Sequence, residues 1–343
     1  MRILVFGAGA IGTYIGGSLA LHGHHVVFLE RPGVATELRR NGLRLNLAGH
    51  EQRIARPKIA ASPDEALGKG HFDVAVFALK AYDTRPALEG LEPYAEALPP
   101  VLCLQNGVEN EPLLREVLGD SKVIAGTVTS AIGRRAAGNI VLERRRGLGV
   151  AARHPLSAEL TTALDAAGLN ARLYPDAARM KWSKLLTNLL ANATSAILDL
   201  TPAEVFDYPG LFRLEIEQLR ETLRVMAAQG LHPVDLPKTP VRALGFAARW
   251  LPLVWGRIVL RRSVGSGRGG KMPSLHIDLH SGRSQSEVEY LNGAVVRFGE
   301  KLGIPTPVNR LLSQTLLALT RGEQDLSIYR HKPERLLVEL KTK

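Results

Sequence analysis

A glycine-rich turn lies near the start of the chain, directly after an apolar stretch. Residues 2–6 read as an apolar strand, Gly7-Ala8-Gly9-Ala10-Ile11-Gly12 follows, and a second apolar run continues to Leu21. This G-x-G-x-x-G pattern between a strand and a helix is typical of dinucleotide-binding units, because the glycines permit a tight turn, close approach of the backbone to a pyrophosphate, and close helix packing. The helix N-terminus then faces the phosphates. An ordinary glycine-rich turn is the alternative.

Two charged residues follow the second predicted strand, His25 to Leu29. In dinucleotide-binding domains, an acidic residue at this point accepts a hydrogen bond from the ribose 2′-hydroxyl of NAD, whereas an arginine pairs with the 2′-phosphate of NADP. The chain offers both, as Glu30 and Arg31. We favour Arg31 and therefore NADPH, while Glu30 keeps NADH open. A solvated strand end is the alternative for either residue.

The N-terminal half alternates short apolar strands with helical stretches. Further apolar runs follow at Phe72 to Leu79, Val101 to Leu104 and Lys122 to Thr127, and the alternation continues to Tyr174. Fully apolar strands fit a parallel sheet that is covered on both faces. The sequence therefore predicts an α/β, Rossmann-like, doubly wound domain over residues 1–175.

Polar residues follow two of these strands. Lys80 comes after one strand, and Asn106, within Gln105-Asn106-Gly107, comes after the next. Open α/β sheets bind ligands at the carboxyl ends of their strands, so we expect Lys80 and Asn106 to lie beside the cofactor or the substrate. A surface lysine, and a turn made by Asn106 with Gly107, are the alternatives.

The pattern changes after Pro175, where long helical patterns replace strands. Helices are expected over Leu211 to Ala228, Ser286 to Leu302 and Asn309 to Thr320. Residues 176–343 are therefore predicted to form an all-α domain.

One predicted helix of this domain carries polar side chains among leucines. Lys184, Asn188 and Asn192 lie at i, i+4 and i+8, which places them in one stripe of a largely buried helix. A lysine and two amides in such a place need polar partners or a cleft that holds a polar substrate. The alternative is the solvated face of an amphipathic helix.

A second polar cluster begins near residue 273. Ser274 and Glu287 have side chains suited to carboxylate and hydroxyl groups, although Ser284 and Glu287 also match a capping box that would begin the next helix. His276 and His280 have the four-residue spacing of zinc ligands on a helix, but the sequence offers no obvious third ligand. We therefore predict no metal site.

Composition narrows the remaining function classes. The net charge of +11 suits small anions, nucleic acid or a membrane surface. Few aromatic residues accompany the basic ones, and the longest later apolar run, Trp250 to Leu260, is interrupted and too short to span a bilayer. A single cysteine, Cys103, points to a reducing compartment, and we recognise no signal peptide. We expect a cytoplasmic protein that binds neither nucleic acid nor membrane.

Taken in order, these motifs resemble the ketopantoate reductase (2-dehydropantoate 2-reductase) family. The resemblance spans nearly the whole chain and rests on the glycine motif, Leu79-Lys80, Gln105-Asn106-Gly107, the helix of Lys184, Asn188 and Asn192, Pro273-Ser274, and Glu287 with Asn292-Gly293. It implies a Rossmann domain and an α-helical domain with the site in the cleft between them. It also implies NADPH-dependent reduction of ketopantoate to pantoate on the route to pantothenate and coenzyme A.

The resemblance further implies roles for individual residues. Lys184 would be the general acid, and Glu287 would be its partner and hold the terminal hydroxyl of the substrate. The residues implied to bind the substrate are Asn188, Asn192 and Ser274, and those implied to lie by the cofactor are Arg31, Lys80 and Asn106. A small oxo acid is the expected partner, and the long helices offer surfaces for a homodimer.

Departures from the family pattern keep other activities open. Glu30 is acidic where a small or apolar residue is more common, one residue is inserted between Gly282 and Glu287, and Leu275 replaces a methionine. Residues 240–271 form a longer, arginine-rich segment, expected to be a surface hairpin, a loop or a lid. The alternative functions are a dehydrogenase for another 2-oxo or 3-hydroxy acid and an NAD(P)-sensing binding protein without turnover.

Overall fold

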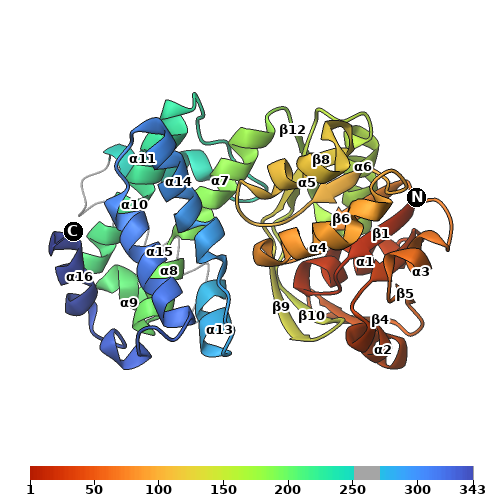
Figure 1. The fold of residues 1–343 in the computed structure, drawn as a ribbon, viewed down its shortest axis with the longest axis horizontal. Coiled ribbons are helices and arrows are strands. Elements are labelled where there is room, and N and C mark those ends of the chain that lie inside the picture. The colour runs from red at the N-terminus through yellow and green to blue at the C-terminus, as the bar shows by residue number, and fades with distance from the viewer. Residues whose placement is uncertain (251–270, 343) are drawn as a thin grey trace. The chain divides into compact units, whose positions relative to one another are not determined.

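The computed structural model describes residues 1–250 and 271–342, and the chain divides into two compact units (Figure 1). The first unit comprises Met1–Lys181 and Asp235–Thr239, and the second comprises Trp182–Val234 and Pro240–Lys343. The sequence-based ranges, 1–175 and 176–343, do not include the return of Asp235–Thr239 to the first unit. That return depends on long-range hydrogen bonds, which no local pattern indicates.

An eight-stranded sheet forms the centre of the first unit. Its strand order is β12-β11-β8-β7-β6-β1-β2-β5, and all neighbours are parallel except β8 and β11. The order reverses at β1, which pairs with β2 on one side and β6 on the other, as in the predicted doubly wound fold. The strands are β1 Arg2–Phe6, β2 His25–Leu29, β5 Lys58–Ala60, β6 Val74–Phe77, β7 Val101–Cys103, β8 Val123–Val128, β11 Leu148–Ala151 and β12 Ala171–Tyr174.

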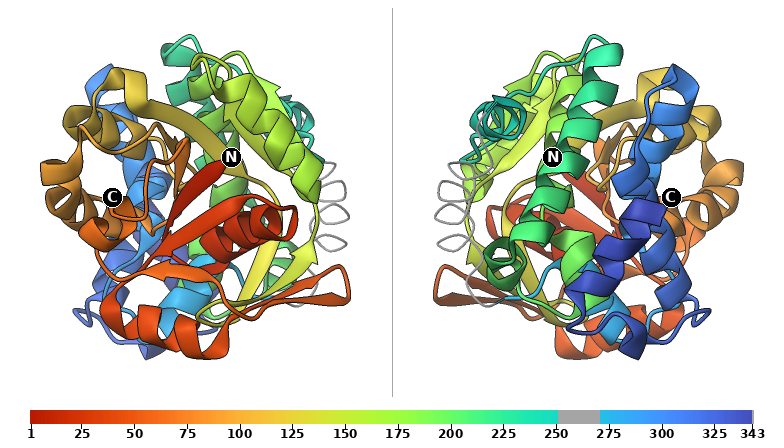
Figure 2. Two further views of the ribbon diagram at one scale, coloured as in Figure 1. Left: turned by 90° about the vertical axis from the view of Figure 1, so that its right-hand side faces the viewer. Right: turned by 90° about the vertical axis from the view of Figure 1, so that its left-hand side faces the viewer.

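Helices cover both faces of this sheet. Ile3 and Val5 of β1 pack in one apolar cluster with α1 (Ala10–Leu21) and α6 (Ser157–Leu164). Leu4 and Phe6 pack in a second cluster with α4 (Thr84–Leu91) and α5 (Asn110–Leu118). Because both faces are buried, the central strands are apolar throughout rather than alternating. The left view of Figure 2 shows α1 beside β1 and β2. The other helices of this unit are α2 Pro32–Asn41 and α3 Pro63–Leu67.

The first unit also holds a four-stranded sheet that the sequence did not indicate. Its order is β4-β3-β10-β9, and α1 packs against it. The edge strand β4 reads HEQRI and is largely exposed, and half of β9, which reads AIGRRA, is exposed as well. Apolar runs therefore do not mark these strands. Their bounds are β3 Leu43–Leu47, β4 His50–Ile54, β9 Ala131–Ala136 and β10 Asn139–Arg144.

The second unit is helical, as predicted, in the residues that the structure describes. The right view of Figure 2 shows α10 beside α14, α15 and α16. The helix expected over residues 286–302 is divided at Leu291 into the 3-10 turn η5 (Glu287–Tyr290) and α14. The helices are α7 Ala177–Leu189, which begins in the first unit, α8 Asn192–Leu198, α9 Pro202–Asp207, α10 Pro209–Ala228, α11 Val241–Trp250, α13 Ser274–His280, α14 Asn292–Leu302, α15 Pro307–Thr320 and α16 Pro333–Thr342.

Two further expectations concern the arginine-rich segment of residues 240–271 and the presence of a membrane span. Most of residues 240–271, the segment expected to be a hairpin, a loop or a lid, lies outside the described residues. The description stops after α11 and resumes at Lys271. Among the helices described, none is both long enough and apolar enough to cross a membrane.

Candidate active site

The glycine turn between β1 and α1 has the backbone that its motif predicts. Gly7 has a φ of +89°, a conformation that favours glycine. A Cβ at Gly12 would collide with the carbonyl oxygen of Gly7, so close packing of α1 requires a glycine there. Among the residues that the structure describes, none would come within 4 Å of a Cβ at Gly9, and no side chain caps the N-terminus of α1. The turn therefore leaves open space at an uncapped helix N-terminus, which fits a phosphate group.

The two charged residues after β2 have different surroundings. Glu30 Oε1 accepts a hydrogen bond from Ala8 N at 2.5 Å, so the carboxylate of Glu30 faces the glycine turn. The Arg31 side chain is 80% exposed, and its guanidinium lies 3.5 Å from Asp83. Asp83 belongs to the short turn directly after Lys80. Glu30 thus contacts the turn itself, whereas Arg31 extends into solvent beside the Lys80 loop.

Gln105 joins the loops that follow β6 and β7. Its Nε2 donates to Lys80 O at 3.2 Å and to Thr84 Oγ1 at 2.8 Å. Asn110 Nδ2 donates to Asn106 O at 2.7 Å, and Thr84 Oγ1 donates to Asn110 Oδ1 at 3.2 Å. Lys80 and Asn106 are half-buried. One buried network therefore holds the backbone of both residues at the carboxyl ends of neighbouring strands.

A buried ion pair supports the loop that follows β7 and carries Asn106. Lys181 Nζ lies 2.7 Å from Glu111 Oε1 and donates to Gln105 O at 2.6 Å and to Gly126 O at 3.3 Å. The two charged side chains are only 5% and 6% exposed. Burial alone would lower the pKa of Lys181, but the nearby Glu111 carboxylate outweighs it and raises that pKa. Lys181 is therefore a charged support for the Asn106 loop. The sequence reading did not find it, because a lysine three residues before Lys184 completes no motif.

The helix of Lys184 ends sooner than the sequence reading assumed. Lys184 and Asn188 lie on a half-buried face of α7, but α7 ends at Leu189, and Ala191 has a φ of +53° before α8 begins at Asn192. The prediction that Lys184, Asn188 and Asn192 form one stripe on a single continuous helix is therefore wrong. The physical reason is the buried Glu215, whose Oε2 accepts a hydrogen bond from Ala191 N at 2.6 Å and so stabilises the break.

The side chain of Asn192 connects two elements of the second unit. Its Nδ2 donates to Asn188 O at 3.0 Å, and its Oδ1 accepts a hydrogen bond from Leu275 N at 3.1 Å. Ser274, the first residue of α13, is exposed directly before this contact. The structure thus brings Asn188, Asn192 and the start of α13 together, and Asn192 holds them in place.

Glu287 is a buried carboxylate at the start of η5. Only 3% of the Glu287 surface is exposed. The cap of this turn is Ser286, whose Oγ accepts a hydrogen bond from Val288 N at 3.3 Å. The capping box of Ser284 and Glu287 considered from the sequence is therefore wrong. The turn is 3-10 and begins one residue after Ser286, so Glu287 does not occupy the third helical position.

The residues singled out from the sequence fall into two groups, one in each unit. The first unit carries Gly7, Ala8, Gly9, Ala10, Ile11, Gly12, Arg31, Lys80 and Asn106. The second unit carries Lys184, Asn188, Asn192, Ser274 and Glu287.

Known proteins match both units in chain order. Residues 3–152 match the family model of the ketopantoate reductase PanE/ApbA, and residues 176–320 match the model of the C-terminal part of that reductase. The curated 2-dehydropantoate 2-reductase of Archaeoglobus fulgidus is 30% identical over 329 residues, covering 94% of this chain and 97% of its own.

Solved structures share the fold. The PanE/ApbA family ketopantoate reductase from Ralstonia eutropha JMP134 has a TM-score of 0.79 and 28% identity, covering 94% of this chain and 100% of its own. A D-mandelate dehydrogenase solved with NADH and anilino(oxo)acetate has a TM-score of 0.76 and 22% identity, covering 94% of this chain and 99% of its own. At that identity the second likeness concerns the fold alone.

Proposed function

Because this chain belongs to the ketopantoate reductase family, we propose that it is an oxidoreductase that reduces 2-dehydropantoate to (R)-pantoate with NADPH, on the route to pantothenate and coenzyme A. The observation that carries the proposal is the match of both units, in order, to the two models of that family. The local geometry of each unit supports it further.

The first unit supplies the proposed cofactor site. The open space at Gly9 and the uncapped start of α1 support binding of a pyrophosphate by the backbone of residues 7–12. Lys80 and Asn106 then contact the nicotinamide end of the cofactor from the ends of β6 and β7. When bound, the cofactor supplies a hydride for the ketone carbon.

The second unit supplies the proposed acid and substrate contacts. The Lys184 ammonium stabilises the negative charge that develops on the ketone oxygen and then donates its proton to that oxygen. Glu287 pairs with Lys184 and accepts a hydrogen bond from the terminal hydroxyl of the substrate. Asn188 and Ser274 bind the carboxylate end, and Asn192 contributes by fixing the start of α13.

Arg31 and Glu30 govern the choice between NADPH and NADH in this proposal. The exposed guanidinium of Arg31 is available to a 2′-phosphate, and Asp83, 3.5 Å away, competes for it. Glu30 favours NADH instead, because a carboxylate at the end of β2 would accept a hydrogen bond from the ribose 2′-hydroxyl of NADH and would repel the 2′-phosphate of NADPH. We assign NADPH as the better cofactor and NADH as a usable second one.

One experiment tests the substrate and the cofactor together. The absorbance of the reduced nicotinamide is followed with ketopantoate and with a panel of other 2-oxo acids, using NADPH and NADH in parallel. We expect ketopantoate with NADPH to give the highest kcat/KM. A higher value for another acid would replace the substrate, and binding of NADPH without oxidation in any mixture would favour a nucleotide sensor.

A related dehydrogenase for another 2-oxo acid is the second candidate. Leu275 and the inserted residue before Glu287 flank the proposed substrate contacts and depart from the family pattern. A D-mandelate dehydrogenase shares this fold, so the fold alone does not select the substrate.

A further inference from the structure

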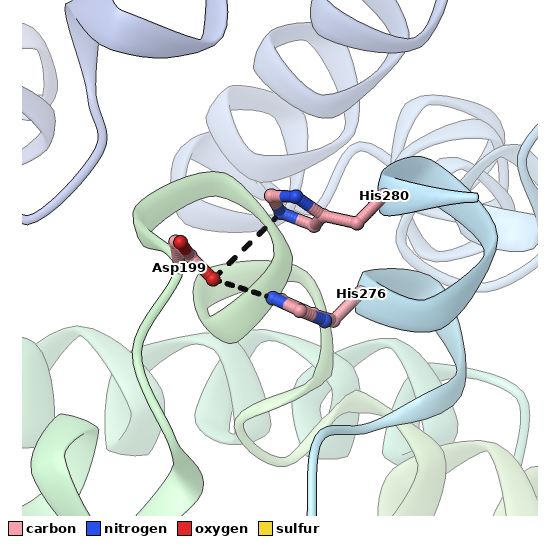
Figure 3. Close-up of side chains that lie close together, drawn as sticks. All are labelled: Asp199, His276 and His280. Atoms are coloured by element: carbon pink, nitrogen blue, oxygen red, sulfur yellow. Dashed lines mark hydrogen bonds and ion pairs between the residues drawn. The ribbon is translucent and has the colours of Figure 1, made fainter. Parts of the chain in front are cut away.

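Asp199, His276 and His280 form a cluster that the proposed reaction does not use (Figure 3). Asp199 follows the last residue of α8, and the two histidines lie one turn apart on α13. His276 Nε2 lies 2.7 Å from Asp199 Oδ1, and His280 Nε2 lies 4.0 Å from the same oxygen. Asp199, which directly follows α8, thus supplies a third candidate ligand that no spacing in the sequence indicates.

The three side chains are held in converging orientations. The imidazole rings of His276 and His280 are stacked, with centroids 4.0 Å apart and planes at 24°. Figure 3 shows a ring nitrogen of each histidine facing Asp199. The second carboxylate oxygen, Oδ2, lies 3.0 Å from Arg330 Nε, which leaves Oδ1 to the histidines. Carboxylates that bind metal ions are commonly held by a hydrogen bond to the oxygen that does not contact the metal.

We propose that this cluster binds a divalent metal ion of the zinc class. Two imidazoles and one carboxylate are ligands that such ions accept, with a water in the fourth position. At metal–ligand distances of about 2.0–2.1 Å, ligand atoms around a tetrahedral ion lie roughly 3.3 Å apart. The contact of His276 with Asp199 must then widen, and that of His280 must shorten, each by about 0.6–0.7 Å, which small side-chain rotations allow.

The ligand set suits a metal, while the surrounding charge limits its affinity. A neutral imidazole offers one ring-nitrogen lone pair to a metal ion, and a carboxylate offers a negatively charged oxygen. The guanidinium of Arg330, whose Nε lies 3.0 Å from Asp199 Oδ2, opposes an added cation. We therefore expect a moderate affinity rather than that of a zinc finger.

A metal here would act as a clamp between two functional helices. Asn192 begins α8 and Ser274 begins α13, and the bond from Leu275 N to Asn192 Oδ1 ties these helices at their N-terminal ends. The cluster joins Asp199, directly after the C-terminal end of α8, to His276 and His280 of α13. A bound ion therefore stabilises the pair that carries the proposed substrate contacts, without touching the reacting atoms.

The test uses the full chain without a histidine tag, treated with a chelator and then freed of it. Titration with Zn²⁺ against a chromophoric chelator is expected to show one equivalent bound, and Co²⁺ is expected to give the visible absorption of a four-coordinate ion. Zn²⁺ should also raise Tm, because the folded chain, which holds the three ligands together, binds it more tightly than the unfolded chain does. The double variant His276→Gln/His280→Gln should lose all three responses, with a Zn²⁺ affinity more than about tenfold weaker.

Controls separate a built site from surface binding and from misfolding. His50→Gln removes an exposed histidine of the first unit and should change none of the responses. Asp199→Asn keeps a residue that tolerates the left-handed φ of +53° and should weaken Zn²⁺ binding without lowering the metal-free Tm strongly. If the double variant fails to fold, His280→Gln alone replaces it, since that side chain is 29% exposed. Equal Zn²⁺ affinity in the parent and the folded histidine variant, or an equal loss in His50→Gln, would overturn the proposal.

Discussion

Lys181 carries its charge in the interior of the first unit, one helical turn before Lys184. Its ammonium is satisfied by Glu111 and by two backbone carbonyls, so the charge is stable only while all of these partners are present. Lys184, in contrast, lies on a half-buried face. Two lysines on one helix therefore serve different purposes, one as a support and the other as the proposed acid.

Lys181→Met is expected to lower the free energy of unfolding by about 3–5 kcal/mol, because it leaves the Glu111 carboxylate buried without its partner. Urea unfolding of the two proteins measures the difference. The double variant Lys181→Met/Glu111→Leu should recover most of the loss, since neither charge then remains. An unchanged midpoint in the single variant would show that Glu111 finds another partner.

Lys184→Ala is expected to reduce turnover by roughly 10²–10⁴-fold while leaving cofactor affinity nearly unchanged, as for a lost general acid. Steady-state rates and fluorescence titration with NADPH measure the two quantities separately. Lys301→Ala, at an exposed position of α14, is the matched control and should retain the parent rate. A near-normal rate in Lys184→Ala would remove this lysine from the mechanism.

Arg31→Ala is expected to raise KM for NADPH and to leave KM for NADH almost the same, because only NADPH has the 2′-phosphate. Arg40→Ala, an exposed arginine on α2, is the control. Glu30→Gln should act in the opposite sense and improve NADPH relative to NADH. Equal weakening of both cofactors by Arg31→Ala would assign the selectivity to Glu30.

At the scale of elements, the sequence predicts what apolar patterns encode. The apolar strands β1 and β2 lie where their runs indicate, as do the long helices α10 and α15. The polar strands β4 and β9 form through pairing with their neighbours, so composition does not reveal them. The break at Ala191 depends on Glu215, which is distant in sequence.

The same limit applies to the candidate site. Gly7 and Gly12 need glycine for reasons that a motif encodes, and the structure gives them that geometry. Lys181 and Gln105 depend on partners brought together by folding, and no spacing rule identifies such partners in advance. The supports of the site were therefore harder to predict than its proposed contacts.

Helix α3 provides a prediction for pH dependence. Glu65 accepts a hydrogen bond from Ala61 N at 2.7 Å and also bonds Lys69 and Arg39, which lowers the pKa of Glu65 to about 2. Because the pKa is lower in the folded chain, this stabilisation is full above about pH 4.5 and is lost as the pH falls toward 2. Glu65→Gln should therefore lower Tm by a constant amount from pH 7 to about 5.

Below pH 4.5 the Tm difference between Glu65→Gln and the parent should shrink. Differential scanning calorimetry at several pH values measures it. Glu89→Gln, at an exposed position of α4, is the control for removing one carboxylate. A Tm difference that stays constant below pH 4.5 would contradict the assigned pKa.

At the scale of the whole molecule, the chain carries a net charge of +11, and both proposed ligands are anions. A cationic protein attracts anions at long range, and added salt screens that attraction. We therefore expect kcat/KM for the oxo acid to fall several-fold as KCl rises from about 0.01 to 0.15 M, where the Debye length shortens from roughly 30 to 8 Å. The value of kcat at saturation should stay nearly constant. A parallel fall of kcat would indicate damage to the chemical step instead.

The return of Asp235–Thr239 to the first unit has a practical consequence for anyone who wishes to dissect the enzyme. The carbonyls of Asp235 and Pro237 accept hydrogen bonds from Tyr174 and Thr129. A gene fragment that stops at Lys181 would encode a first unit in which the hydroxyls of Tyr174 and Thr129 have lost these two acceptors. Swapping halves between relatives accordingly requires two junctions, or a graft of this pentapeptide, rather than one cut.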